Sequence, residues 1–368
     1  MDLQEKSFTA NTRLKILYLI PADDTTKGGM IQITKMFYDI GLFENKNIKH
    51  FNTFFKSGEY FFSRLFESFF SKVRFFFILI KFKPDVVFVM TSAYWGFFDK
   101  VVYCLIARMF GVKSMLNPVG DFADFYEESQ WKAFCIRMAL KLPSIILIGS
   151  VYWNQYFKTN YPFISIDSVV NPVDSKKYYR SKNRFETKTR IVSISGIVLE
   201  KGIVELVKVI QQVCSRSQEF IFIIMGVGDK LNWVMEELNT EIEKGLVEVK
   251  GLVSDAEKIA EFEIADIFMM LSHNEVIPIS ILEAMSASLP IISTNVGGIP
   301  DIVIHEKNGL LYPRYVVEPV VELILSLSGK KEVLHQMGKI SRQIVTDEYD
   351  ISQVLERHIF LAEKLVGN

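Results

Sequence analysis

Two glutamates, Glu275 and Glu283, lie eight positions apart in the stretch HNEVIPISILEAM. Pro278 stands between them and disfavours one continuous helix, because proline removes a backbone donor and clashes with the preceding turn. We therefore expect Glu275 on a loop and Glu283 on a short helix, where the two acids could bind one ligand together. Two plainer roles compete. Glu275 would be a solvated loop acid, and Glu283 would form a capping box with Ser280.

Glycine-rich turns follow several apolar segments. Gly28 and Gly29 come after the first of them, where they would let the backbone approach a ligand and open a helix whose N-terminal amides favour anions. Lys201 begins another expected helix, and a lysine beside helix-terminal amides is a suitable counter-charge for phosphate. Each feature alone also fits an ordinary strand-to-helix turn or an exposed lysine. Together with a further Gly-Gly-x-Pro turn at 297–300, they indicate one ligand-binding cleft.

Short apolar segments alternate with longer helical patterns along the chain, which is typical of a parallel sheet covered on both faces. The sequence predicts doubly wound α/β architecture twice, with ligands at the carboxyl ends of the strands. The expected domains are residues 1–172, residues 173–345 and a C-terminal helix over 346–368 that packs back on the first domain. The segments read as strands are 14–20, 84–90, 143–149, 190–196, 220–226, 264–272 and 290–296.

Composition excludes several classes of protein. A chain of 368 residues with 49 % hydrophobic residues can bury a large core, and a net charge of −1 argues against nucleic acid as a partner. The 3 cysteines have no zinc or disulfide spacing, and the N-terminus has no secretory signal pattern. The longest apolar runs are broken by lysine and arginine, below the length of a membrane-spanning helix. We expect a cytoplasmic protein, soluble or peripheral on the inner face of the cell membrane.

The segment from Phe51 to Phe82 has aromatic residues at three- and four-residue steps, with more basic than acidic residues between them. This spacing predicts an amphipathic helix with a heavy aromatic face. Two interpretations stay open. The helix could pack on the sheet of the first domain, or it could rest on an anionic membrane through residues 51–82. Both can hold if adjoining turns of the helix face different ways.

The ordered set of motifs resembles the retaining glycosyltransferases of family 4, which have the GT-B fold. The resemblance spans nearly the whole chain and is strongest over residues 190–315. The matching residues are Gly28-Gly29, Asn171-Pro172-Val173-Asp174, Glu200-Lys201-Gly202, Glu275-x7-Glu283 with Ala284-Met285, Pro290, Gly297-Gly298-Ile299-Pro300 and Asn308-Gly309.

The resemblance implies two Rossmann-like domains facing each other across a cleft, and transfer of a sugar from a nucleotide-sugar donor with retention of configuration. Glu275 would bind hydroxyls of the donor sugar, Glu283 the ribose, and Lys201 the pyrophosphate. The donor-binding set so implied is Gly28, Gly29, Lys201, Glu275, Val276, Ile277, Ile279, Ser280 and Glu283. The residues implied in catalysis are Glu275 and Lys201, and Asp121 would partly substitute, near the acceptor, for a histidine that the family commonly has.

The resemblance also sets expectations for substrates. A UDP-sugar is the favoured donor, with a GDP-sugar as the main rival. The acceptor would be a glycan or lipid-linked saccharide in bacterial surface polysaccharide synthesis, for example of lipopolysaccharide. The resemblance implies transfer of the hexosyltransferase type that needs neither a metal nor a further cofactor, and the chain has no D-x-D metal motif.

The sequence departs from the family pattern in three ways. Gly196 stands where the family commonly has an arginine, Val276 and Pro278 replace the usual glycines, and the stretch 117–129 lacks the usual histidine. These departures motivate a second interpretation beside the active enzyme, a catalytically weakened GT-B subunit that binds a nucleotide-sugar and supports a partner enzyme. A nucleotide-sugar epimerase or sugar-phosphate synthase is a third interpretation.

Overall fold

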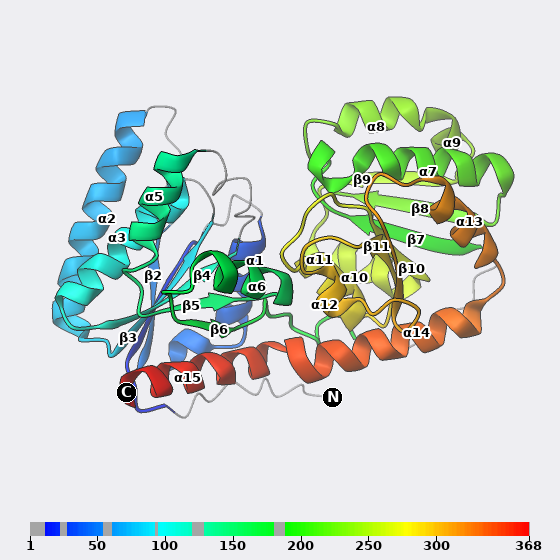
Figure 1. Ribbon diagram of the computed structural model, residues 1–368. Helices are drawn as coiled ribbons and strands as arrows, with labels where there is room; N and C mark the ends of the chain where they lie inside the picture. Colours follow the sequence, from blue (N-terminus) through cyan, green and yellow to red (C-terminus); the bar gives the residue numbers. More distant parts are fainter. Residues whose placement is uncertain are drawn as a thin grey trace. The chain divides into compact units, whose positions relative to one another are not determined.

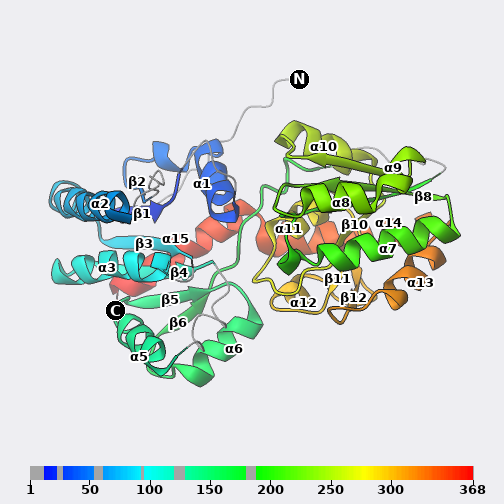
Figure 2. The same cartoon turned by 90° about the horizontal axis from the view of Figure 1, so that it is seen from above.

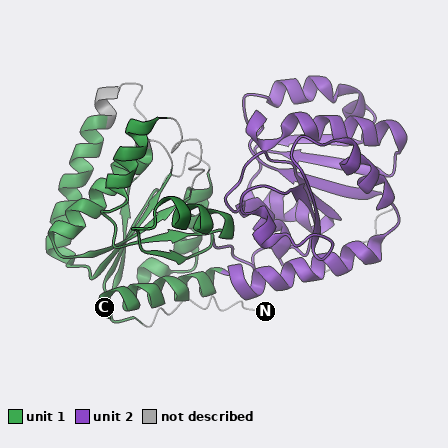
Figure 3. Ribbon diagram, in the orientation of Figure 1, with its two compact units in different colours: residues 1–171, 351–368 green, residues 172–350 purple. Residues whose placement is uncertain are grey.

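The computed structural model describes residues 12–22, 28–53, 61–92, 95–119, 129–179 and 188–367, without the side chains of residues 61–64 and 95 (Figure 1). The chain forms two compact units (Figure 3). Unit 1 comprises Met1–Asn171 and Ile351–Asn368, and unit 2 comprises Pro172–Asp350. The chain therefore leaves unit 1 after its sixth strand and returns to it in the last helix.

Unit 1 contains a parallel six-stranded sheet in the order β2-β1-β3-β4-β5-β6. Its strands are β1 (Ile16–Ile20), β2 (Ile48–Asn52), β3 (Val86–Thr91), β4 (Lys113–Pro118), β5 (Ile145–Ile148) and β6 (Ile166–Ser168). Its helices are α1 (Gly29–Asp39), α2 (Phe61–Phe82), α3 (Trp95–Met109), α5 (Gln130–Ala139), α6 (Val151–Asn160) and α15 (Ile351–Gly367), with a 3₁₀ turn at Leu42–Glu44.

Both faces of this sheet are covered. The strand order reverses direction after β2, and right-handed crossovers then place α1 on the opposite face from α2 and α3. α15 shares the face of α1, where the His358 ring contacts Phe37 (Figures 1 and 2). On the other face Phe75 of α2 packs edge-on against Phe51 and against Tyr103 of α3. Two-sided burial explains why β1 and β3 are apolar at nearly every position.

Unit 2 contains a second parallel six-stranded sheet, in the order β12-β11-β10-β7-β8-β9. Helices α7, α8, α9 and α13 lie on one face of it, and α10, α11, α12 and α14 lie on the other (Figure 1). The strands are β7 (Thr189–Ile194), β8 (Phe220–Met225), β9 (Val247–Gly251), β10 (Ile267–Met270), β11 (Ile291–Thr294) and β12 (Gly309–Tyr312). The helices are α7 (Ile203–Arg216), α8 (Leu231–Glu237), α9 (Asn239–Glu243), α10 (Asp255–Ile264), α11 (Ile279–Ser286), α12 (Ile299–Ile302), α13 (Glu318–Ser326) and α14 (Lys331–Ile344), with short turns at Leu199–Lys201 and Val345–Tyr349.

The prediction of two doubly wound, Rossmann-like α/β domains is confirmed by these two sheets. Each sheet has a point where the strand order reverses, between β1 and β3 in unit 1 and between β7 and β10 in unit 2. At such a point the loops after two adjacent strands leave the sheet in opposite directions. In open α/β sheets this leaves a crevice at the carboxyl ends of the strands, where ligands bind. The sequence analysis missed β2, β4, β6, β9 and β12.

Within the described ranges, no helix combines the length and the apolar character that crossing a bilayer requires.

One buried titratable group anchors α15 in unit 1. His358 is 2 % exposed, and its ring lies 4.6 Å from the ring of Phe88 and near those of Tyr18 and Phe37. Its Nδ1 lies 3.3 Å from the Tyr18 hydroxyl, while Nε2 has no hydrogen-bond partner among the described residues. Burial lowers the pKa of His358 to about 3. The folded protein therefore holds this imidazole neutral.

Unit 1 should lose stability as the pH falls from neutral toward 5. An unfolded histidine has a pKa near 6.5, so between this value and about 3 the unfolded state binds more protons than the folded state, and the free energy of unfolding decreases with falling pH. His358 alone should contribute a loss of about 2 kcal/mol between pH 7 and pH 5. Urea unfolding of the wild type and of His358→Phe at both pH values measures this, because the difference between the two proteins cancels the other groups. Identical pH dependence in both proteins would contradict the prediction.

Candidate functional site

Lys201 and Glu275 meet at the point of unit 2 where the strand order reverses. Lys201 lies on the turn between β7 and α7, and Glu275 lies on the loop between β10 and α11. The Lys201 Nζ is 2.5 Å from the Glu275 Oε1, and the Ser272 hydroxyl donates to the same oxygen at 3.0 Å. The side chains are 32 % and 11 % exposed, so the lysine remains reachable from solvent. A cation and a hydrogen-bond acceptor thus stand together at the crevice.

Close contacts between backbone segments hold this loop in place. Gly202 (φ 67°) and Gly297 (φ 51°) have the left-handed backbone conformation that favours glycine. A Cβ atom at Gly202 would lie 1.8 Å from the Leu271 carbonyl oxygen, and one at Gly297 would lie 1.7 Å from the Glu275 carbonyl oxygen. The Gly298 amide donates to that same Glu275 oxygen at 3.1 Å, and the His273 amide donates to the Glu200 carbonyl at 2.9 Å. The β10–α11 loop is therefore clamped between the β7–α7 and β11–α12 turns.

A second polar group lies next to this pair. His273 Nε2 is 3.1 Å from the Glu205 Oε2, and the His273 ring lies 4.4 Å from the exposed ring of Tyr315. Tyr315 has a positive φ of 69°, which is uncommon for a bulky residue. The sequence analysis did not single out Ser272, Glu205 or Tyr315. These residues are far apart in the sequence, and they come together only because the loops that carry them are neighbours in the folded unit.

Glu283 belongs to a separate, buried cluster. Its Oε1 accepts a hydrogen bond from the Tyr178 hydroxyl at 2.7 Å and lies 2.6 Å from the Lys258 Nζ. The side chains of Lys258 and Glu283 are only 6 % and 7 % exposed. Burial and the Glu283 carboxylate raise the pKa of Tyr178 far above its usual value, so the phenol stays a donor. The capping-box alternative with Ser280 is wrong. Pro278 is the N-cap of α11 and the helix start has no side-chain cap, because Glu283 turns into the core instead.

The loop and first turn of α11 carry the other residues assigned to donor binding. Ile277 and Ile279 are buried and serve as packing groups, while Val276 and Ser280 are half-buried. The amides at the start of a helix have no acceptor within the helix itself, so the N-terminus of α11 suits an anion or a hydroxyl oxygen.

The remaining assigned residues belong to unit 1. Gly28 lies just before α1, where an added Cβ would meet no described atom within 4 Å, and Gly29 is the first residue of α1. Asp121 lies outside the described residues, as does the rest of the stretch 120–128. In the described part of the chain, no group of three or more His, Cys, Asp and Glu side chains is arranged to hold a metal ion.

The C-terminal half of the chain matches a known family. Residues 174–344 match the model of glycosyl transferases group 1. An uncharacterized glycosyltransferase of Haemophilus influenzae is 27 % identical over 230 residues, which is 61 % of this chain and 62 % of that protein. A putative colanic acid biosynthesis glycosyltransferase, WcaL of Escherichia coli, is 26 % identical over 47 % of this chain and 44 % of its own length. The matched region thus spans less than two thirds of these relatives.

The fold has counterparts among solved structures. The Anabaena protein HepE, in complex with UDP, superposes with a TM-score of 0.72 at 15 % identity, covering 96 % of this chain and 100 % of the other. Residues 174–344 are thus similar to glycosyl transferases group 1, and the whole chain shares its fold with the HepE structure.

Proposed function

We propose that this protein is a retaining, metal-independent glycosyltransferase of the hexosyltransferase type in family 4. It would move a sugar from a UDP-sugar to a glycan or lipid-linked saccharide in bacterial surface polysaccharide synthesis, at the inner face of the cell membrane. The observation that carries the proposal is the Lys201–Glu275 pair, which lies at the strand-order reversal of unit 2 inside the segment that matches the family. UDP is favoured because a structural neighbour is a UDP complex.

The pair has the chemistry that cleavage of a sugar–diphosphate bond needs. The leaving diphosphate gains negative charge as the bond breaks, so a fixed cation and helix-terminal amides aimed at it stabilise the transition state more than the ground state. Lys201, just before α7, supplies the cation. Glu275 accepts hydrogen bonds from the sugar hydroxyls and orients the anomeric carbon. Without ligand the two side chains neutralise each other, and the donor replaces this contact by phosphate on the lysine and hydroxyls on the glutamate.

Glu283 acts on the nucleotide end of the donor in this proposal. Tyr178 and Lys258 both contact Oε1, which leaves Oε2 to accept hydrogen bonds from the ribose. Two donors on one oxygen fix the carboxylate before the ligand arrives, so little rotamer entropy is lost on binding. The expected roles of Gly28, Gly29 and Asp121 from unit 1 remain part of the proposal.

Replacing Glu275 by glutamine should abolish the preference of the protein for UDP-sugar over UDP. A carboxylate that accepts sugar hydroxyls contributes about 1.5–3 kcal/mol, or roughly ten- to a hundredfold in affinity, whereas UDP itself does not use it. Isothermal titration with UDP, UDP-glucose and UDP-N-acetylglucosamine measures both affinities. Glu263→Gln, an exposed acid on α10, is the matched control. An unchanged ratio of UDP-sugar to UDP affinity would remove Glu275 from the sugar site.

Replacing Glu283 by glutamine should both destabilise unit 2 and weaken ribose recognition. Removing one partner of a buried ion pair costs about 3–5 kcal/mol, while Ser280→Ala should change stability by less than about 0.5 kcal/mol because Ser280 caps nothing. The ratio of affinities for UDP and 2′,3′-dideoxy-UDP, measured where the variant is folded, separates the two roles. A variant that keeps the wild-type ratio would confine Glu283 to packing.

Gly196 favours the alternative of a weakened subunit, since the family commonly has a phosphate-binding arginine there. The position can accept one. Its φ lies outside the left-handed region, and an added Cβ would meet only the Val198 side chain, at 3.8 Å.

Gly196→Arg should therefore raise UDP affinity about tenfold or more through a charge-assisted hydrogen bond to phosphate. Gly196→Met is the uncharged control of similar length, measured by the same titration. Equal UDP affinities of the arginine and methionine variants would show that an added positive charge at position 196 does not strengthen phosphate binding. Sugar transfer by the purified wild-type chain alone would exclude the weakened-subunit alternative.

A further inference from the structure

Helix α2 of unit 1 is apolar on two opposite sides. Its inward side buries Ser71, Phe75, Leu79 and Phe82 against the sheet and α3. Its outward side carries seven large apolar side chains that fall within an arc of about 140° at 100° per residue. These are Leu65, Phe66, Phe69, Phe70, Phe76, Phe77 and Ile80, between 42 % and 64 % exposed.

The exposed apolar area continues onto the neighbouring helix. The Phe76 ring packs against that of Phe110, at 5.2 Å, just beyond the end of α3. α3 itself exposes Val102, Leu105 and Met109 at helical spacing. We call these eleven side chains the α2–α3 surface. Soluble proteins rarely expose contiguous apolar areas of this kind without a binding role.

Helix α2 does pack on the sheet of unit 1, through the side that contains Phe75, Leu79 and Phe82. Most of the aromatic stripe that the sequence analysis identified points away from the sheet, so the membrane interpretation concerns a different side of the same helix. The helical spacing of apolar residues could not predict which side of α2 faces the sheet, because both sides are apolar.

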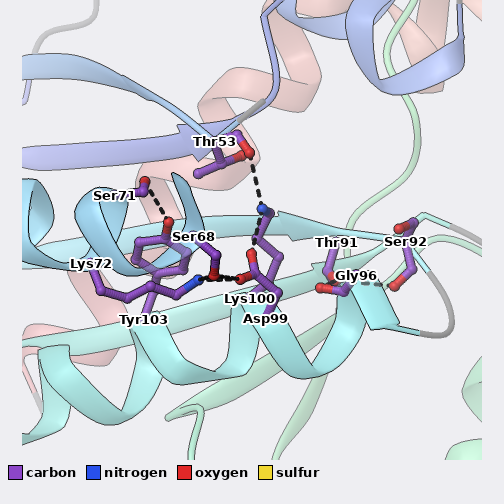
Figure 4. Close-up of polar contacts among 10 residues, drawn as sticks. All are labelled: Thr53, Ser68, Ser71, Lys72, Thr91, Ser92, Gly96, Asp99, Lys100 and Tyr103. Atoms are coloured by element: carbon purple, nitrogen blue, oxygen red, sulfur yellow. Dashed lines mark hydrogen bonds and ion pairs between the residues drawn. The ribbon is translucent and has the colours of Figure 1, made fainter. Parts of the chain in front are cut away.

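Polar contacts between α2 and α3 fix which side faces outward (Figure 4). Ser68 donates to the Asp99 carboxylate at 2.6 Å, and Lys72 pairs with the same carboxylate. The Tyr103 hydroxyl donates to the Ser71 hydroxyl at 2.7 Å. Rotating α2 to bury its phenylalanines would break all three contacts and leave Asp99 against apolar side chains. The exposure of the α2–α3 surface is therefore built into the fold.

Charge is distributed unevenly around this surface. Between residues 65 and 113 the chain has seven basic and three acidic residues, although its overall net charge is −1. The exposed basic side chains are Arg74, Lys81, Lys83, Arg108 and Lys113, and the exposed acids are Glu67 and Asp85. On α2, Glu67, Arg74 and Lys81 share a stripe of about 40° beside the apolar arc. Arg74 and Lys81 thus lie beside the apolar arc, and an apolar area with basic residues at its edge complements an anionic bilayer.

We propose that the α2–α3 surface docks unit 1 on an anionic lipid bilayer, with the phenylalanines at the level of the acyl chains and the basic residues at the headgroups. Protein interfaces are enriched in Phe and Met, but also in Tyr, Trp and Arg, whose polar groups hydrogen-bond to the partner. The centre of this surface contains only Phe, Leu, Ile, Val and Met, which cannot hydrogen-bond to a partner protein but lose nothing in lipid. A membrane-borne, lipid-linked acceptor follows from this docking, and that step alone rests on the proposed function.

Vesicle sedimentation tests the docking without any substrate. The full chain should bind vesicles of phosphatidylcholine with 30 % phosphatidylglycerol, and bind pure phosphatidylcholine more weakly. Replacing Phe66, Phe69, Phe70 and Phe77 together by serine should lower binding at least about tenfold, because buried apolar area drives insertion. Arg74→Gln with Lys81→Gln should lower binding to the anionic vesicles roughly twenty-five-fold, about fivefold per charge, and should reduce its dependence on salt. Phe163→Ser with Phe360→Ser, two exposed phenylalanines elsewhere in unit 1, should leave binding unchanged.

Three results would overturn the proposal. The wild type could fail to bind either vesicle, the serine variant could bind as well as the control, or the wild type could be a dimer that the serine variant dissociates while neither binds lipid. The last result would assign the surface to a second copy. UDP titration of the serine variant keeps the two proposals apart, because donor binding in unit 2 should be unchanged whether or not the vesicles are bound.

Discussion

The candidate site depends on how closely the backbone of the β10–α11 loop approaches its neighbours. Gly202 and Gly297 are the two places where another turn reaches the loop, and a single methyl group at either would overlap a carbonyl oxygen. β7 and β10 are adjacent strands whose connections leave the sheet in opposite directions. The turn after β7 and the loop after β10 are therefore neighbours at the carboxyl end of the sheet. The clamp therefore places Lys201 and Glu275 side by side. The Ser272 hydroxyl then fixes the Glu275 carboxylate within the clamp.

The two glutamates of the site differ in how readily their ion pairs can open. The Lys201–Glu275 pair is partly exposed, and pairs of that kind contribute little to stability, so a ligand can displace one partner from the other at small cost. The Lys258–Glu283 pair is almost fully buried, and separating it would leave a charge without a partner in the core. Glu275 can thus exchange its lysine partner for a ligand, whereas the side chain of Glu283 is held in one place, although both residues lie on the connection between β10 and β11.

Sequence patterns predicted the features of this protein that depend on local chemistry. Apolar strands, the strand-to-helix glycines and the split of the Glu275–Glu283 stretch into loop and helix could all be read because each follows from a few adjacent residues. Features set by tertiary partners could not. Ser280 and Glu283 have the spacing of a capping box, yet Tyr178 and Lys258, 105 and 25 positions away from Glu283, draw the carboxylate inward. β2 was missed because its IKHFN sequence has only two apolar residues, with two polar ones between them, and lacks a continuous apolar run.

Helix α2 shows why a two-sided apolar helix needs polar contacts to define it. Lys72 and Lys100 share the Asp99 carboxylate. Burial alone would raise the pKa of Asp99, but the two neighbouring positive charges hold it below its usual value. Burying such a network adds little net stability, since desolvation offsets much of the attraction. Its effect is on specificity. The hydrophobic term alone would favour whichever side of α2 buries more phenylalanine, and the loss of the Asp99 contacts and of the Tyr103–Ser71 hydrogen bond opposes that rotation. In water the polar contacts therefore keep the aromatic side of α2 exposed at a hydrophobic cost. On a lipid surface that side is buried in the bilayer while the polar contacts stay intact.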